Sequence, residues 1–226
     1  MIRRTLIQPS ILPTRVRLSF PGVKFMCGIF GYVGKSADAP QKVFTGLKDI
    51  EYRGYDSWGI ACWEVEGGRW KVEKRVGFLP ATLNLPSSNI SLGHTRWATH
   101  GGVTEANAHP HSDCSNKIVL VHNGIVENYL ELKESLKLHQ FKSETDTEVI
   151  VHLIEDQMKK NKFPQAVADV FNKLAGLNAV VVSDGKSLVA VKNSSPLVLG
   201  QTKEGFVIAS DPNALLPLTS NLIFLE

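Results

Sequence analysis

The sequence has no long hydrophobic run. No stretch of 18 consecutive apolar residues occurs among its 226 residues, so we expect no transmembrane helix and no membrane partner. Internal repeats and composition-biased linkers are also missing. A chain of this length without repeats or linkers is typical of one large domain that buries its own core.

Cysteine is scarce and odd in number. The three cysteines, Cys27, Cys62 and Cys114, have no regular spacing. A disulfide-stapled secreted domain needs an even set. We therefore interpret all three as reduced thiols and expect a cytoplasmic protein.

Outside residues 1–25, the sequence has no excess of basic over acidic side chains. That segment holds five basic and no acidic side chains, which leaves 20 basic and 22 acidic side chains in the rest. The net charge of +3 thus becomes −2, and we expect no nucleic-acid partner. Three origins for residues 1–25 stay open: sequence upstream of a true start at Met26, a cleaved targeting or pro-segment, or a retained tail.

A cysteine directly follows a methionine at Met26-Cys27-Gly28. If everything up to Met26 is removed, Cys27 carries a nucleophilic thiol and a free α-amine that can serve as its base. An internal Cys27 has an amide nitrogen, which cannot accept a proton. The alternative is a structural role, in which Cys27 is a small buried cysteine on a core strand. We expect the glycines at 28 and 31 to leave the thiol uncrowded and to let the backbone approach a ligand.

Hydrophobic periodicity predicts an α+β domain. Thr145 and Glu148 form the pattern of a capping box at the start of one predicted helix. We expect the strands to pack into two sheets with the helices outside. Strands are predicted at 28–33, 57–65, 70–76, 90–94, 117–122 and, as short pieces, from 178 to 226; helices are predicted near 43–50, 127–139, 145–158 and 164–174.

Six polar motifs occur in a fixed order. They are Cys27–Gly31 after a methionine, Glu51–Ser57, His94–Gly101, Asn107–His111, His122–Gly124 and Ser143–Glu148. Together they resemble the glutaminase domains of glucosamine-6-phosphate synthases, which are class II glutamine amidotransferases of hexosamine synthesis. The resemblance runs from Met26 to the last residue. It implies a four-layer αββα sandwich of the N-terminal nucleophile (Ntn) hydrolase type over residues 26–226.

The resemblance assigns roles to the central residues. It makes Cys27 the nucleophile, and it makes the Asn123 side-chain amide and the Gly124 N–H the oxyanion hole. Arg96 would hold the α-carboxylate of L-glutamine, and Asp146 its α-ammonium. From the residues alone, Asn-Gly is also a common hairpin turn, although a helix pattern follows it here, and Asp146 also suits the first turn of a helix.

Further residues are assigned less specific roles by the same resemblance. Thr99 and His100 would line the glutamine pocket. Trp97 would gate the exit of ammonia, or simply pack in the core, and Arg53 would position the nucleophile, or form a surface salt bridge. Trp58 departs from the family, which usually has a small residue there, and we expect it to change the wall near Arg53.

The implied reaction hydrolyses L-glutamine to glutamate and ammonia through a Cys27 thioester, with no cofactor and no metal. His109, His111 and Cys114 are possible metal ligands, but their short spacing and the lack of a second ligand pair argue against a zinc site.

In the family, ammonia passes to sugar-isomerase domains that bind fructose 6-phosphate. This sequence contains no such domains, so we expect a further module or a partner chain. Two alternatives remain. One is a non-catalytic regulatory or partner-binding domain, if residues 1–25 are retained. The other is an asparagine-synthetase-like amidotransferase, which Glu51–Ser57 and His94–Gly101 disfavour.

Overall fold

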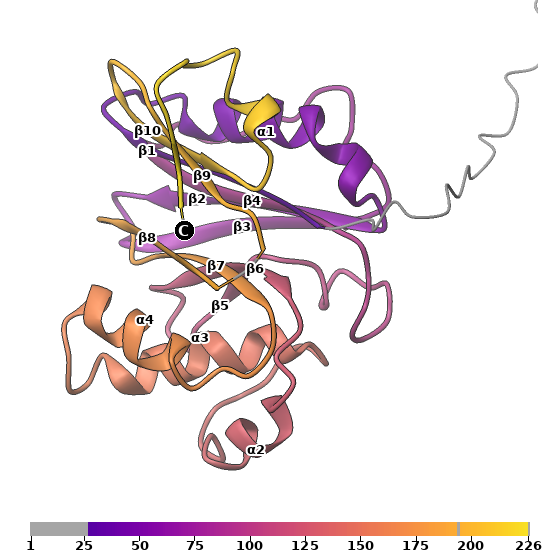
Figure 1. Ribbon diagram of the computed structural model, residues 1–226, viewed down its shortest axis with the longest axis vertical. Helices are drawn as coiled ribbons and strands as arrows, with labels where there is room; N and C mark the ends of the chain where they lie inside the picture. Colours follow the sequence, from indigo (N-terminus) through magenta and orange to yellow (C-terminus); the bar gives the residue numbers. More distant parts are fainter. Residues whose placement is uncertain (1–26, 194, 226) are drawn as a thin grey trace, which may run out of the picture.

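The computed structural model describes residues 27–193 and 195–225. The segment 1–25, whose origin was left open above, and Met26 lie outside the described residues. Four layers are stacked in the described part: helix α1 (Ala39–Asp49), two β-sheets, and a layer with helices α3 (Asp146–Gln157) and α4 (Phe163–Phe171) (Figure 1). The predicted four-layer αββα sandwich is therefore confirmed. No helix among these residues is long and apolar enough to cross a bilayer.

The larger sheet has seven antiparallel strands with β1 near its centre. β1 pairs with β10 on one side and with β4 on the other. The order across this sheet is β11 (Leu222–Phe224), β9 (Val198–Gln201), β10 (Gly205–Ala209), β1 (Gly28–Gly34), β4 (Ile90–Arg96), β2 (Ser57–Glu64) and β3 (Arg69–Val76).

The smaller sheet has four antiparallel strands. Its order is β5 (His111–Ser112), β6 (Val119–Gly124), β7 (Asn178–Ser183) and β8 (Leu188–Lys192). The short helix α2 (Tyr129–Glu134) follows β6 and lies at the lower edge of Figure 1. Two 3₁₀ turns, Glu51–Arg53 and Pro212–Ala214, complete the described elements.

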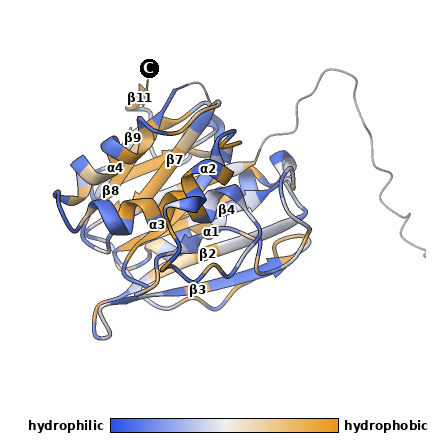
Figure 2. Ribbon diagram, turned by 90° about the horizontal axis from the view of Figure 1, so that it is seen from below, coloured by the Kyte–Doolittle hydropathy of each residue, from blue (hydrophilic) through white to orange (hydrophobic). Residues whose placement is uncertain are grey.

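Three hydrophobic clusters hold the four layers together. Several strands each contribute to two of these clusters, because successive side chains point to opposite faces of a sheet. Ile29 packs between the sheets, whereas Phe30 packs beneath α1. In the same way Val181 packs between the sheets, and Val180 packs against the helices of the outer layer. Figure 2 shows the contrast between the hydrophobic β7 and the mostly hydrophilic edge strand β3.

Three local predictions need correction. The helix predicted at 127–139 is only the six-residue α2, and Leu138 beyond it is 98% exposed. Strand β4 runs two residues past its predicted end and so includes Arg96. Only half of the capping box forms: Thr145 accepts the Glu148 N–H, while the Glu148 carboxylate accepts N–H groups from residues 142 and 143 instead.

The two glycines of β1 that closely follow Cys27 serve the packing of this strand. A Cβ at Gly28 would lie 2.4 Å from the Thr95 hydroxyl and 2.9 Å from the Ile50 side chain. A Cβ at Gly31 would lie 3.1 Å from Leu92 in the core between the sheets. These glycines therefore allow β4 and the α1 layer to pack closely against β1. Their effect on the space around the thiol stays a prediction.

Candidate active site

Several chain segments converge at one end of the sandwich. Cys27 directly precedes β1, and the pairing of Gly28 with Thr95 brings it beside Arg96 at the end of β4. Strand β6 ends nearby at Gly124, and α3 begins at Asp146. These segments line a narrow pocket.

Seven of the nine predicted site residues line this pocket. They are Cys27, Arg96, Trp97, Thr99, His100, Gly124 and Asp146. The other two, Arg53 and Asn123, contact the Cys27 carbonyl from outside it. Four lining residues were given no role by the sequence analysis: His109, His122, Thr145 and Thr147.

The Cys27 thiol is held by the backbone of Trp97. The Trp97 N–H donates to Sγ at 3.2 Å, and the thiol donates to the Trp97 carbonyl oxygen at an Sγ–O distance of 3.4 Å. Burial raises the pKa of the Cys27 thiol, and the Trp97 N–H and the charge of Arg96 offset this only in part. The thiol is therefore protonated near neutral pH, and attack on a substrate needs a base.

Asn123 is oriented by a histidine that the sequence analysis left without a role. Nε2 of His94 lies 3.0 Å from Asn123 Oδ1 and 3.1 Å from the His122 carbonyl. Both partners are acceptors, so Nε2 carries the proton. Burial lowers the pKa of His94 to about 3, which keeps the ring neutral. The Asn123 amide group is thereby turned toward Cys27, and it donates to the Cys27 carbonyl at 2.9 Å. One amide proton is left for another acceptor.

Gly124 occupies a backbone conformation that excludes a side chain. Its φ is +138°, and a Cβ would lie 2.2 Å from the Leu177 carbonyl oxygen. The hairpin alternative for Asn123-Gly124 is wrong, because β6 pairs with β5 and β7 rather than with the segment that follows it. The dipeptide instead ends a strand at the pocket.

Arg96 is 3% exposed and organises the loop that follows β4. Its guanidinium donates to the carbonyls of Gly102 at 3.1 Å and Gly101 at 3.4 Å, and to that of His100. These bonds use at most three of its five N–H groups, so two remain for a carboxylate. Arg96 thus lines the pocket and also fixes the loop that carries His100.

Asp146 occupies both the first turn of α3 and the pocket lining. It is the first residue of α3, where the helix dipole stabilises a carboxylate. It also lines the pocket, is 4% exposed, and accepts the Val126 N–H at 2.7 Å. A fixed, buried carboxylate at this position is suited to bind a cation.

Arg53 lies against the nucleophile from the Glu51–Arg53 turn. Its Nε donates to the Cys27 carbonyl at 3.4 Å, and its guanidinium pairs with Asp211 at 3.3 Å. Its side chain is only 14% exposed, so the ion pair is not the surface pair of the alternative interpretation. Asp211, which also accepts the Tyr52 hydroxyl, was missed; its signal was the Asp-Pro pair that caps the second 3₁₀ turn.

The two tryptophans behave differently. The ring of Trp97 is partly exposed and meets Tyr55 edge-on at 5.5 Å, next to the pocket. Trp58 is 2% exposed, packs in the cluster beneath α1 and donates its Nε1–H to the Phe78 carbonyl at 3.1 Å. The expected change near Arg53 is thus not seen, because the Trp58 ring is part of the α1 core.

The three residues weighed as metal ligands are divided between two places. His109 stacks with His94 and His111 near the pocket, and burial lowers the pKa of both His109 and His111 well below the usual range. Cys114 instead contacts His139 and His152.

Comparison with known proteins agrees with this geometry. Residues 94–217 match the family described as the glutamine amidotransferase domain. The chain is 46% identical over 215 residues to glutamine–fructose-6-phosphate aminotransferase (isomerizing) of Thermococcus kodakarensis, covering 89% of this chain and 35% of that protein. An enzyme of the same name from Thermus thermophilus is 46% identical over 210 residues, with 89% of this chain and 34% of that protein covered. The chain thus spans about a third of the length of these relatives.

Solved structures give the same result. The glutamine phosphoribosylpyrophosphate amidotransferase of B. subtilis superposes with a TM-score of 0.71 at 25% identity, covering 88% of this chain and 44% of that one. A predicted glutamine amidotransferase from Pseudomonas aeruginosa shares the fold, with a TM-score of 0.52 at 16% identity and 90% of that chain covered. The sandwich is that of the Ntn hydrolases, and the chain belongs to the glutamine amidotransferase domain family.

Proposed function

We propose that this pocket hydrolyses the side-chain amide of L-glutamine to glutamate and ammonia, with Cys27 as the nucleophile. One observation carries the proposal: the partly buried Cys27 shares a small pocket with a buried cation, Arg96, and a buried carboxylate, Asp146. An α-amino acid presents the complementary pair of charges. Thr99 and His100 complete the wall of the same pocket.

The reaction proceeds in two halves. The α-amine of a mature N-terminal Cys27 takes the thiol proton as sulfur attacks the amide carbon. The free amide proton of Asn123 and the Gly124 N–H stabilise the oxyanion. The ammonium at Cys27 then protonates the leaving nitrogen, the C–N bond breaks, and ammonia departs from a glutamyl thioester. Water, activated by the same amine, attacks the thioester and releases glutamate and the thiol.

The proposal assigns the domain boundaries. Residues 26–226 form the amidotransferase domain, and residues 1–25 must be absent from the active form together with Met26. Membership in the amidotransferase family does not favour the non-catalytic alternative. The three free thiols of the described chain fit a reducing, cytoplasmic compartment.

The names of the relatives suggest where the ammonia goes. Those proteins are called glutamine–fructose-6-phosphate aminotransferases, and about two thirds of their length has no counterpart in this chain. We infer that a sugar-isomerase module or partner chain receives the ammonia and aminates fructose 6-phosphate in hexosamine synthesis. The partial exposure of Trp97 and the contact of its N–H with the thiol support a gating role for this residue in the transfer.

Removing residues 1–26 should activate the enzyme. Two forms are compared, one retaining residues 1–26 and one expressed from Met26, and intact mass establishes each N-terminus. The form beginning with Cys27 should release glutamate about 10²–10⁴ times faster, because only it has the amine as general base. Cys27→Ala should abolish release in both forms. Equal rates from the two unaltered forms would refute the amine's role.

The pH dependence of thiol alkylation gives a second test. With residues 1–26 retained, alkylation of Cys27 by iodoacetamide should keep rising beyond pH 9, because burial raises its thiol pKa. In the form beginning with Cys27, the rate should change near the α-amine pKa of about 7.7. Per-residue mass spectrometry in a Cys114→Ser background isolates the signal. If the alkylation rate of the form that retains residues 1–26 reached a plateau below pH 8, the thiol would be activated without the amine.

Arg96→Ala should mainly raise KM for glutamine. Loss of a charge-assisted, bidentate grip on a carboxylate costs about 1.5–3 kcal/mol, or roughly 10- to 100-fold in KM. Circular dichroism and thermal unfolding control for the loop that Arg96 also holds. Glutaminase kinetics provide the measurement, and an unchanged KM in a folded variant rules out the carboxylate role.

His94 should act through Asn123, which a double-mutant cycle can test. Asn123→Ala should lower kcat by about 10²–10³ as an oxyanion donor is lost. His94→Phe should lower kcat by less with little effect on KM, and His94→Gln, whose amide replaces the Nε2–H, should restore it. In the Asn123→Ala background, His94→Phe should cost nothing further. Additive losses would show that His94 acts independently of Asn123.

A further inference from the structure

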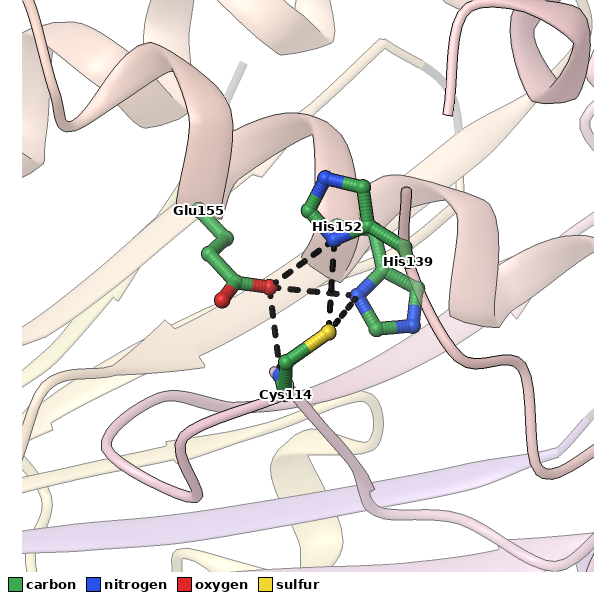
Figure 3. A group of neighbouring side chains, drawn as sticks. All are labelled: Cys114, His139, His152 and Glu155. Atoms are coloured by element: carbon green, nitrogen blue, oxygen red, sulfur yellow. Dashed lines mark hydrogen bonds and ion pairs between the residues drawn. The ribbon is translucent and has the colours of Figure 1, made fainter. Parts of the chain in front are cut away.

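Four potential metal ligands meet outside the pocket. Cys114 lies in the loop between β5 and β6, His139 in the segment between α2 and α3, and His152 and Glu155 one turn apart on α3. Figure 3 shows Cys114 Sγ, both Nδ1 atoms and one Glu155 oxygen pointing toward one another. All four ligand atoms lie within 4.8 Å of each other.

Four of the six distances between these atoms are close to the edges of a tetrahedron around zinc. Zinc binds nitrogen and oxygen at about 2.0–2.2 Å and sulfur at about 2.3 Å, so tetrahedral edges are about 3.3–3.6 Å. Sγ of Cys114 lies 3.4 Å from His139 Nδ1 and 3.6 Å from His152 Nδ1. The Glu155 oxygen lies 3.2 and 3.3 Å from the same two nitrogens.

The outer nitrogens of both rings face carboxylates. His139 Nε2 lies 3.1 Å from Asp156, and His152 Nε2 lies 3.6 Å from Glu148. A carboxylate behind a ligating imidazole fixes the ring and leaves the inner nitrogen unprotonated to bind metal. Both side chains are well buried, with 7% and 1% exposed.

We propose that Cys114, His139, His152 and Glu155 bind one structural zinc ion. A thiolate and a carboxylate neutralise Zn²⁺, and a mixed sulfur, nitrogen and oxygen set suits this metal. Four protein ligands leave no open position, so the ion does no chemistry. It clamps two loops to α3, the helix that presents Asp146 to the pocket.

The sequence analysis lacked the second ligand pair because it considered Cys114 together with His109 and His111. The available signal was the His152-x-x-Glu155 spacing, which places both side chains on one helix face. His139 carries no such signal, since only the path of the 135–145 segment brings it to Cys114.

Metal analysis of the whole chain tests the site. Protein purified without chelators or a histidine tag is assayed for zinc, then stripped and titrated with Co²⁺. We expect about one zinc per chain, and with Co²⁺ the visible bands of a tetrahedral site together with a thiolate charge-transfer band. Zinc should also raise the melting temperature of the stripped protein, because metal binding favours the folded state.

Variants separate this site from other thiols. Cys114→Ser should remove the thiolate band, and Cys114→Ser with His139→Gln should remove stoichiometric binding and the thermal shift. Cys27→Ala and Cys62→Ser, which alter the other two cysteines, should leave all three signals unchanged. Absence of stoichiometric zinc or cobalt binding by the unaltered chain overturns the proposal, as does binding that survives the double substitution.

Discussion

The pairing of β1 with β4 at the centre of the large sheet is the constraint on which the site depends. The register Gly28 to Thr95 places the residue before β1 beside Arg96 at the end of β4. A slip of one residue would exchange the two faces of β1 and move Ile29 and Phe30 into each other's cores. The packing that stabilises the fold therefore also sets the distance between nucleophile and cation.

A network of buried hydrogen bonds then sets the orientation of the site. His94, which β4 also carries, turns the Asn123 amide toward Cys27, and Asn123 and Arg53 both bind the Cys27 carbonyl. Hydrogen bonds in a low-dielectric interior are stronger than in water, so these bonds restrain Asn123 and the Cys27 carbonyl. The nucleophile is consequently held by its own backbone carbonyl as well as by its thiol.

Much of this arrangement could be predicted from the sequence, and the reasons are local. Hydrophobic patterns predicted strands at β1 and β7 and two sheets with the helices outside, and seven residues from the ordered motifs line one pocket. The rest depends on tertiary contacts. No periodicity indicates that His94 bonds Asn123 across 29 positions, that Asp211 pairs with Arg53, or that His139 reaches Cys114. The leucine pattern that predicted a long helix at 127–139 was misleading, because the chain leaves the helix at residue 134 to reach α3.

Burial also determines the protonation states of the site residues. Burial keeps His94, His109 and His122 in their neutral forms and raises the pKa of the Cys27 thiol. A neutral histidine could in principle serve as the base. However, His94 Nε2 already donates to two acceptors, and with a pKa of about 3 the ring is a poor proton acceptor. An amine on Cys27 itself has an ordinary pKa near neutrality and sits beside the thiol by covalent connection. In the proposed mechanism, the desolvated thiol at the start of a central strand therefore takes its base from the α-amine of Cys27, and activity requires a chain that begins at this residue.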